Sequence, residues 1–303
     1  MRRYTLRQLD TFLEVARTGS VSKTAEKLHV TQPAVSMQLK QLEEALGMPL
    51  IEVVGRRMRM TEAGKDVEQC AAAAIARLKE LDDLVSAHRG LKKGKIDLAV
   101  VSTAKYFVPM LLVHFRKKFP DIDISLQIHN RESMMNLLAR NEVDLIVMGR
   151  APNTMDCSAT AFATNPMGVV SAPDHPLSRR RAAPMSLLAG AEFVVREKGS
   201  GTRSAMEQVF AEYQLTPKIV MEMPSNETIK QAVMAGMGLS FLSLRTVRHE
   251  LASGHLTLVD VVGLPIIRQW YVTHLSAKRL SPAAQVLKTF LIEEAGPLVN
   301  AWA

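Results

Sequence analysis

Residues 20–47 read SVSKTAEKLHVTQPAVSMQLKQLEEALG and contain two helical patterns joined by a tight turn. The apolar spacing predicts one helix over residues 21–28 and a second over residues 32–46. Gly47 suits the left-handed position that follows the end of a helix. Residues 6–16 form a third amphipathic pattern ahead of this pair. The stretch therefore predicts a helix-turn-helix preceded by one packing helix.

The second helix of this pair has one apolar face and one polar face, and Thr31 is expected to be its N-cap. Its apolar positions are Val35, Leu39, Leu42 and Leu46. The residues predicted to face outward and bind DNA are Gln32, Pro33, Ser36, Met37 and Lys40. Short polar side chains at the start of such a helix let base edges approach closely. A three-helix bundle without a nucleic acid partner is the alternative at this point.

A basic hairpin is predicted directly after this motif. Residues 49–53 and 55–60 have the pattern of a hairpin, and three arginines lie within four positions at its tip and along its return strand. We expect Arg56 and Arg57, with Arg59, to contact phosphates or a minor groove, as in a wing beside a helix-turn-helix. A solvated basic turn is the alternative.

Charge and composition limit the classes of partner. The 303 residues carry a formal net charge of +8, and the first 60 hold ten Lys and Arg against six Asp and Glu. Such a surplus favours a polyanion, either nucleic acid or an anionic membrane. No apolar run approaches the roughly 18 residues of a membrane span, and no secretory signal is visible, so we expect a cytoplasmic protein without a membrane partner. Two cysteines and scattered histidines predict neither a disulfide framework nor a metal site.

A long helix is predicted over residues 61–90. Its apolar positions are spaced alternately four and three residues apart, which is the spacing of a heptad seam: Val67, Ala71, Ala74, Leu78, Leu81 and Val85. A seam of this kind needs a second helix to cover it, and a second copy of the chain is a natural source. Packing against the chain's own C-terminal half is the alternative. Cys70 lies beside the seam and is expected to be a small buried residue.

From Lys95 onward, strand-like apolar runs alternate with helical patterns. This alternation indicates an α/β architecture with largely parallel strands. Two similar sets of runs predict two lobes, one over about residues 95–165 and 266–303 and the other over about residues 166–265. The predicted domains are thus a winged helix-turn-helix (1–60), a dimerisation helix (61–90) and a two-lobed domain (91–303).

Ligands of two-lobed α/β domains bind near the carboxyl ends of strands, where several segments here open with polar side chains. The predicted ligand-binding residues are Ser102, Thr103, Lys105, Asn130, Arg131, Glu132, Thr202, Arg203, Asn226 and Glu227. Helix N-termini and basic side chains favour a small anion, although N-capping alone also explains many of these residues. No catalytic constellation stands out, so an enzyme is not expected.

The N-terminal residues resemble the winged helix-turn-helix of LysR-type transcriptional regulators. The resemblance is carried by Leu9, Phe12, Val15, Gly19, Ser20, Ala25, Leu28, the run from Thr31 to Ser36, Leu39, Leu42, Glu43, Leu46, Gly47, Leu50 and the run from Thr61 to Gly64. Met37 and Val53 stand where many members have arginine. The resemblance implies that Gln32, Pro33 and Ser36 meet DNA and that the long helix dimerises.

Segments of the C-terminal half are similar to regulators of Calvin-cycle carbon-fixation operons. They are residues 101–109, 130–132, 140–150, 199–203 and 225–233. The resemblance implies a homodimer or homotetramer that binds double-stranded promoter DNA, works with RNA polymerase and is modulated by an effector. It implies no cofactor, and the effector is expected to be a phosphorylated metabolite or NADPH. The rival classes are a solute-binding protein, which would have a secretion signal and no helix-turn-helix, and a metabolic enzyme.

Overall fold

The structure is a computed structural model that describes the backbone of residues 4–54, 57–88 and 94–301, without the side chains of residues 54, 57, 79–80 and 82–88. The chain forms two compact units. The first contains residues 1–85, and the second contains residues 86–139 and 143–303. The boundary falls near the C-terminal end of the long helix α4 (Glu62–His88).

Three short helices begin the first unit: α1 (Leu6–Thr18), α2 (Val21–Leu28) and α3 (Gln32–Leu46). The predicted bounds of α2 and α3 are confirmed, and α1 continues two residues beyond the expected end at Ala16. Gly19 and Gly47 adopt the left-handed conformation, with φ of 62° and 74°, which ends α1 and α3. Thr31 occupies the N-cap position of α3, but its side chain makes no capping hydrogen bond.

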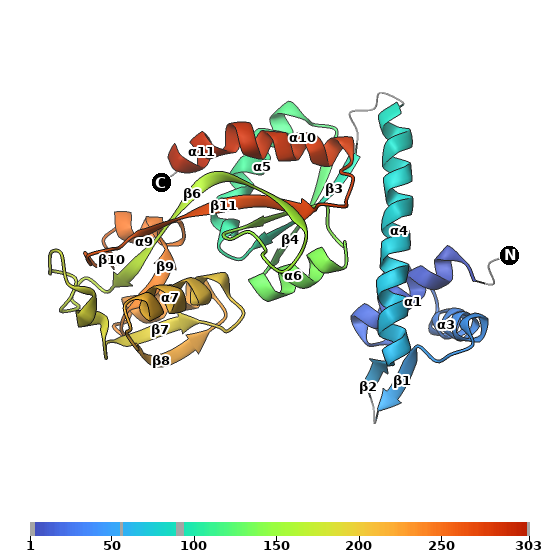
Figure 1. Cartoon of the computed structure of the whole chain (residues 1–303), viewed down its shortest axis with the longest axis horizontal. Coiled ribbons are helices and arrows are strands. Elements are labelled where there is room, and N and C mark those ends of the chain that lie inside the picture. The colour runs from blue at the N-terminus through green and yellow to red at the C-terminus, as the bar shows by residue number, and fades with distance from the viewer. Residues whose placement is uncertain (1–3, 55–56, 89–93, 302–303) are drawn as a thin grey trace. The chain divides into compact units, whose positions relative to one another are not determined.

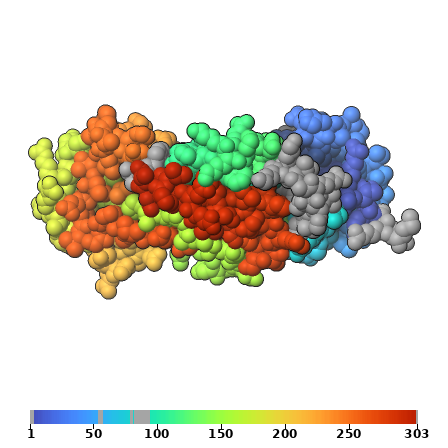
Figure 2. Space-filling view, turned by 90° about the horizontal axis from the view of Figure 1, so that it is seen from above, coloured from blue at the N-terminus to red at the C-terminus, as the bar shows by residue number. Residues whose placement is uncertain are grey.

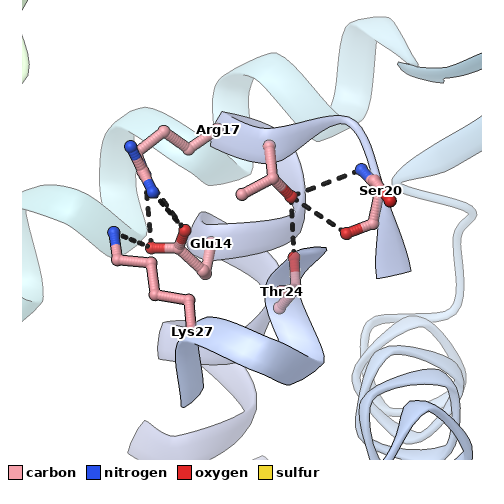
Figure 3. A network of polar contacts seen from close by, with 6 residues as sticks. Glu14, Arg17, Ser20, Thr24 and Lys27 are labelled. Atoms are coloured by element: carbon pink, nitrogen blue, oxygen red, sulfur yellow. Dashed lines mark hydrogen bonds and ion pairs between the residues drawn. The ribbon is translucent and has the colours of Figure 1, made fainter. Parts of the chain in front are cut away.

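Polar contacts join α1 to α2 (Figure 3). Glu14 forms ion pairs with Arg17, at 2.6 Å, and with Lys27 of α2, at 2.8 Å. The hydroxyl oxygens of Thr18 and Thr24 are 2.7 Å apart. Phe12 of α1 and Ala25 of α2 also share one core, so polar contacts and apolar packing both hold α2 against α1.

The predicted hairpin is present as β1 (Ile51–Val54) and β2 (Arg57–Met60), which pair antiparallel. Glu43 of α3 connects it to the helices. One carboxylate oxygen, Oε1, accepts from the backbone N–H groups of Leu50, at 2.7 Å, and Ile51, at 3.1 Å. The Leu50 side chain is fully buried in the same core as Phe12 and Val35. The wing is therefore fixed to α3 by both packing and hydrogen bonds.

Helix α4 begins beside the wing, where the Thr61 hydroxyl accepts from the backbone N–H of Gly64 at 2.9 Å. The first two seam residues of α4 are covered within the chain itself. Ala71 is buried in the core of the first unit, and Val67 packs against that core. Cys70 is exposed, so the expectation that it is buried is wrong. The seam faces outward only farther along, where Leu78 and Leu81 are exposed.

A seven-stranded sheet forms the frame of the second unit (Figure 1), in the order β10-β6-β11-β5-β3-β4 with β9 also paired to β6. Its strands are β3 (Gly94–Val101), β4 (Ile122–His129), β5 (Leu145–Met148), β6 (Cys157–Ser171), β9 (Ser240–Ser243), β10 (Thr257–Leu258) and β11 (Ile266–Leu275). Among the described strands of this sheet, β3, β4 and β5 are the ones that pair in parallel. The expectation of largely parallel strands is wrong, because β11 and the unpredicted β6 run antiparallel to their neighbours.

Lobe 1 is the part that packs around β3, β4 and β5. Its helices are α5 (Val108–Lys118), α6 (Arg131–Ala139), α10 (Pro282–Phe290) and α11 (Gly296–Ala301). The C-terminal helices, red in Figure 2, lie on the surface beside α5, and the Phe115 and Phe290 rings meet with centroids 5.4 Å apart. Helix α10 is followed directly by one π-helical turn (Leu291–Ala295).

Lobe 2 packs around the parallel pair β7 (Glu192–Arg196) and β8 (Lys218–Met223), together with β9. Its helices are α7 (Gly201–Glu212), α8 (Asn226–Met234) and α9 (Arg248–Ala252). β6 and β11 run through both lobes. Phe162 and Trp270 lie in the lobe 1 core, whereas Met167 and Val169 lie in the lobe 2 core. The lobes are therefore connected by a paired ribbon of two long strands.

Candidate functional site

The outward face of α3 is exposed. Gln32, Pro33, Ser36, Met37 and Lys40 all lie on the surface of the first unit. Among the described residues, Lys40 forms a long ion pair, 3.8 Å, with exposed Glu44, so its charge is available to a polyanion. Helix α3 thus presents small and polar side chains in front of a tightly packed core, which is the arrangement that a base-contacting helix needs.

The wing adds basic groups at the end of this surface. Arg59 is exposed on β2, where it pairs in register with Glu52 of β1. Arg56 and the side chain of Arg57 lie outside the described residues. Val53, which stands at a position expected to carry arginine in many relatives, is 69% exposed.

An apolar groove of about 780 Å³ runs between α1 and α4 in the first unit. Its lining includes four residues of the predicted seam, which are Val67, Ala71, Ala74 and Leu78. Leu6, Leu9 and Leu46 line the other side. Leu81 lies beyond the groove and is exposed, and the side chain of Val85 is outside the described residues. An exposed apolar groove that continues along a helix is typical of a self-association surface.

The second unit contains a cavity of about 180 Å³ where the two lobes meet. Five of the predicted ligand-binding residues line it: Ser102, Thr103, Asn130, Arg131 and Thr202. The lining also includes residues that sequence analysis did not select, which are Arg150, Asn153, Asn165, Ser200, Ser204 and Arg268. The cavity lies at the ends of β3, β4 and β5, as the rule for α/β domains predicts.

Three guanidinium groups contribute to this lining without a carboxylate among the lining residues. Arg131 is oriented by a hydrogen bond from its Nη1 to the backbone carbonyl of Arg150, at 2.7 Å. Burial, reinforced by the charge of Arg150, lowers the pKa of Arg131 from its usual value. The pKa of Arg268 is lowered by burial and then by Arg150 and Arg131. This mutual repulsion means that an anion placed among the three arginines would be stabilised.

Lobe 2 supplies neutral donors opposite these arginines. Helix α7 begins at Gly201, and the Ser200 hydroxyl caps it by accepting from the Thr202 N–H at 3.2 Å. Free backbone N–H groups at a helix start favour negative charge. Gly199 has a φ of +83°, and a Cβ there would lie 2.5 Å from the Glu132 carboxylate. The left-handed backbone conformation and the nearby carboxylate both favour glycine where this loop meets lobe 1.

The remaining predicted residues lie near the cavity but are not part of its lining. Buried Arg203 pairs with Glu207, at 2.6 Å, and Glu222, at 3.5 Å, and so ties α7 to β8. Glu132 packs against Gly199. Lys105, Asn226 and Glu227 take part in a separate polar cluster between the lobes.

The residues that sequence analysis missed fall into two groups. Arg150 and Asn153 follow β5, so the same strand-end rule would have found them. Asn165 and Arg268 lie inside β6 and β11, and they reach the cavity because these two strands cross from one lobe to the other. No local signal marks them.

Two further observations concern the part of the chain that the structure describes. No helix in it is both long and apolar enough to span a membrane. Within the same residues, no three His, Cys, Asp or Glu side chains gather in a way that could hold a metal ion.

Comparison with known proteins identifies two family models. Residues 6–65 match the bacterial regulatory helix-turn-helix protein model of the lysR family, and residues 89–296 match the LysR substrate binding domain. The chain is 43% identical over 290 residues to the RuBisCO operon transcriptional regulator of Allochromatium vinosum, with 96% of each chain covered. It is 43% identical to the HTH-type transcriptional regulator CfxR of Cupriavidus necator, over 97% of this chain and 92% of the relative.

Among solved structures, the second unit is similar to the CcmR regulatory domain of Synechocystis PCC6803 in complex with 2-PG. The TM-score is 0.64 and the identity 40%, over 66% of this chain and 96% of that chain.

Proposed function

Because the chain belongs to the LysR family of helix-turn-helix transcriptional regulators, we propose that it controls a carbon-fixation operon in response to a small anionic metabolite. The observation that carries this proposal is the cavity in which Arg131, Arg150 and Arg268 converge without a carboxylate among the lining residues. Relatives named for RuBisCO operons support the choice of operon. We assign DNA binding to residues 1–60, dimerisation to residues 61–90 and effector binding to residues 91–303.

The effector we propose is a small phosphorylated carboxylic acid, and 2-phosphoglycolate, the 2-PG of the CcmR complex, is the probe of choice. Sites for drug-sized ligands have volumes of about 300–1,000 Å³. The present cavity of about 180 Å³ suits a smaller molecule. NADPH is larger than a drug-sized ligand, so it is the less favoured of the two effector classes.

Calorimetric titration of the full chain tests the effector site. We expect 2-phosphoglycolate to bind, and Arg268→Ala to cost about 2 kcal/mol, roughly a thirtyfold rise in Kd, because a charge-assisted hydrogen bond is lost. Arg179→Ala, at an exposed position outside the cavity lining, is the matched control and should bind as the wild type does. Equal binding by Arg268→Ala and the wild type would remove this cavity from effector recognition. Binding of NADPH but not of 2-phosphoglycolate would overturn the assignment of the ligand.

For DNA, we propose that Gln32 and Ser36 contact base edges, that Pro33 and Met37 pack close to the bases, and that Lys40, Arg56 and Arg57 contact phosphates. Ser36→Ala should then weaken binding to the promoter site more than to random DNA, whereas Lys40→Ala should weaken both about equally and lower the salt dependence. Footprinting on the DNA upstream of the operon, with a fluorescence titration against random DNA, measures both. An equal loss on the two DNAs for Ser36→Ala would contradict base recognition.

We propose that α4 residues Ala74, Leu78, Leu81 and Val85, with Val67 and Ala71 at its packed start, support a homodimer or homotetramer. We further propose that the regulator acts in the cytoplasm with RNA polymerase, needs no cofactor and catalyses no reaction. A metabolic enzyme of the same fold would turn over 2-phosphoglycolate, so recovery of unchanged ligand after incubation checks this last point.

A further inference from the structure

A polar cluster joins the two lobes beside the effector cavity but outside its lining. Tyr106 belongs to the 3₁₀ turn Ala104–Tyr106 of lobe 1, which follows β3. Its hydroxyl donates to Oε1 of Glu227, in the first turn of α8 in lobe 2, at 2.5 Å. Neither residue is part of the cavity lining. This contact therefore connects the lobes through protein groups alone.

Glu227 is held in place from the side of lobe 2. The ammonium group of Lys230 lies 2.8 Å from Oε2 of Glu227 and 2.8 Å from Oε1 of Glu250. Lys230 has only 5% of its side chain exposed, so these two carboxylates compensate a buried charge. Because Lys230 fixes one oxygen of Glu227 from within lobe 2, the other oxygen is free to accept from Tyr106.

The aromatic ring of Tyr106 adds a second kind of contact to this cluster. The ammonium of Lys230 is 5.1 Å from the ring centroid, and that of Lys105 is 5.2 Å from it. Both distances are within the range of cation–π attraction. The Tyr106 ring of lobe 1 thus lies near buried Lys230 of lobe 2 and near Lys105, which precedes it in the chain.

The hydroxyl of Tyr106 remains a hydrogen-bond donor at any physiological pH. Burial, followed by the hydrogen bond to Glu227, raises the pKa of the phenol above its usual value. The pKa of Glu227 is lowered overall, because hydrogen bonds from Lys230 and Tyr106 outweigh the opposing effect of burial. The pair therefore keeps its donor and its charged acceptor, and the contact does not act as a pH sensor.

A second contact links this cluster to the effector cavity. Arg196, fully buried at the end of β7, donates from Nη2 to the hydroxyl of Ser102, at 3.1 Å, and from Nη1 to Oδ1 of Asn226, at 2.7 Å. Ser102 lines the cavity and lies four residues before Tyr106. Asn226 directly precedes Glu227. The same turn of lobe 1 and the same helix start of lobe 2 thus serve both the cavity and the cluster.

We propose that Tyr106, Glu227 and Lys230 form an inter-lobe latch that holds the lobes together independently of the effector. The strength of the latch sets the fraction of molecules whose lobes are already arranged to bind. The apparent affinity for any ligand is the intrinsic affinity multiplied by that fraction. Tyr106 is in this sense a positioning residue, which acts on the ligand through lobe geometry and not through contact.

Tyr106→Phe tests the latch, because it removes the donor while keeping a ring near Lys105 and Lys230. Tyr213→Phe removes an exposed phenol hydroxyl from α7's C-terminal end and is the matched control. The measurement is the distance between spin labels at exposed Lys117 in lobe 1 and exposed Ser253 in lobe 2. It uses full-length protein with Cys70 and Cys157 replaced by serine, diluted with unlabelled chain so that distances within one chain dominate.

Without added ligand, we expect Tyr106→Phe to broaden the distance distribution toward longer values and Tyr213→Phe to leave it unchanged. Adding 2-phosphoglycolate should narrow the broadened distribution again, and calorimetry should give a Kd about tenfold higher for Tyr106→Phe. Glu227→Gln, which weakens the acceptor and its pairing with Lys230, should act in the same direction. Identical distance distributions for wild type, Tyr106→Phe and Glu227→Gln would overturn the latch.

The ligand-free distances decide the latch, whereas binding of 2-phosphoglycolate by the wild type decides the proposed function. If Tyr106→Phe raises the Kd for 2-phosphoglycolate about tenfold but leaves the distances between the spin labels unchanged, Tyr106 contacts the ligand directly. This result would also overturn the latch.

Discussion

At the scale of single residues, His274 near the end of β11 shows how a buried titratable group is kept in one state. Its Nδ1 lies 2.9 Å from the backbone carbonyl of Leu275, and its Nε2 lies 2.9 Å from Nζ of Lys288. An ammonium group can only donate, so Nε2 accepts and Nδ1 carries the proton. The ring is therefore neutral in the folded protein.

This arrangement predicts a pH dependence of stability. Burial lowers the pKa of His274, and the charges of Lys288 and Lys278 lower it further against the carbonyl of Leu275. A histidine with a lowered folded-state pKa stabilises the fold above its unfolded pKa of about 6.5, and that contribution is lost as the pH falls toward the folded pKa. Urea unfolding at pH 7.5 and at pH 5.5 measures this effect. The free energy of unfolding should fall less between pH 7.5 and pH 5.5 for His274→Asn than for the wild type. An equal decrease in the two proteins would exclude His274 as a cause.

At the scale of elements, helices α2 and α3 could be predicted to the residue because their determinants are local. Apolar spacing and the glycine after α3 are properties of neighbouring residues. Strand β6 could not, because its sequence CSATAFATNPMGVVS contains proline, glycine and asparagine, and its strand pairing comes from β9, β10 and β11 far along the chain. The same limit applies to the site. Ser102 and Arg131 follow strand ends, whereas Arg268 reaches the cavity only through long-range pairing.

The contact between α3 and the wing predicts a coupling between two DNA-binding elements. Glu43→Ala would leave the N–H groups of Leu50 and Ile51 without their acceptor. We expect a loss of about 1–3 kcal/mol in the free energy of unfolding. Binding to promoter DNA should weaken as well, although Glu43 itself carries a charge that DNA repels.

Urea unfolding and footprinting over the wing contacts measure these two effects. Glu43→Gln retains an acceptor oxygen and should lose less stability, and exposed Glu44→Ala should change the unfolding free energy by no more than about 0.5 kcal/mol. Unaltered protection over the wing contacts in Glu43→Ala would show that the hydrogen bonds do not position the wing.

At the scale of the whole molecule, two copies of α3 are needed to recognise a two-fold symmetric DNA site. The exposed part of the α4 seam provides the surface we propose for this pairing. Leu81 is 55% exposed and continues the line of the groove between α1 and α4. Exposure of these apolar side chains to water is unfavourable, and their burial against a second copy of the chain would stabilise the associated state.

Leu81→Glu is therefore expected to shift the protein toward monomers without unfolding it. Two glutamates facing each other across a paired seam would repel and would also lose the apolar contact. Sedimentation velocity at several concentrations measures the association, with exposed Val113→Glu on α5 as a control for an apolar surface residue elsewhere. If Leu81→Glu sediments as the wild type does while Val113→Glu dissociates, the association surface lies on the second unit and not on α4.

The paired strands β6 and β11 also affect the order in which the lobes can fold during synthesis on the ribosome. Every buried residue of the main lobe 2 core lies between positions 167 and 261, whereas the lobe 1 core combines Ile96 and Leu98 with Trp270, Leu287 and Val299. When residue 261 has been synthesised, every residue of the main lobe 2 core is present. Lobe 1 then still lacks strand β11 and its C-terminal helices. During synthesis, lobe 2 can fold first, and the β3 residues Ile96 and Leu98, which α5 already helps to cover, lack the core residues of β11 and α10 until the C-terminal segment has emerged.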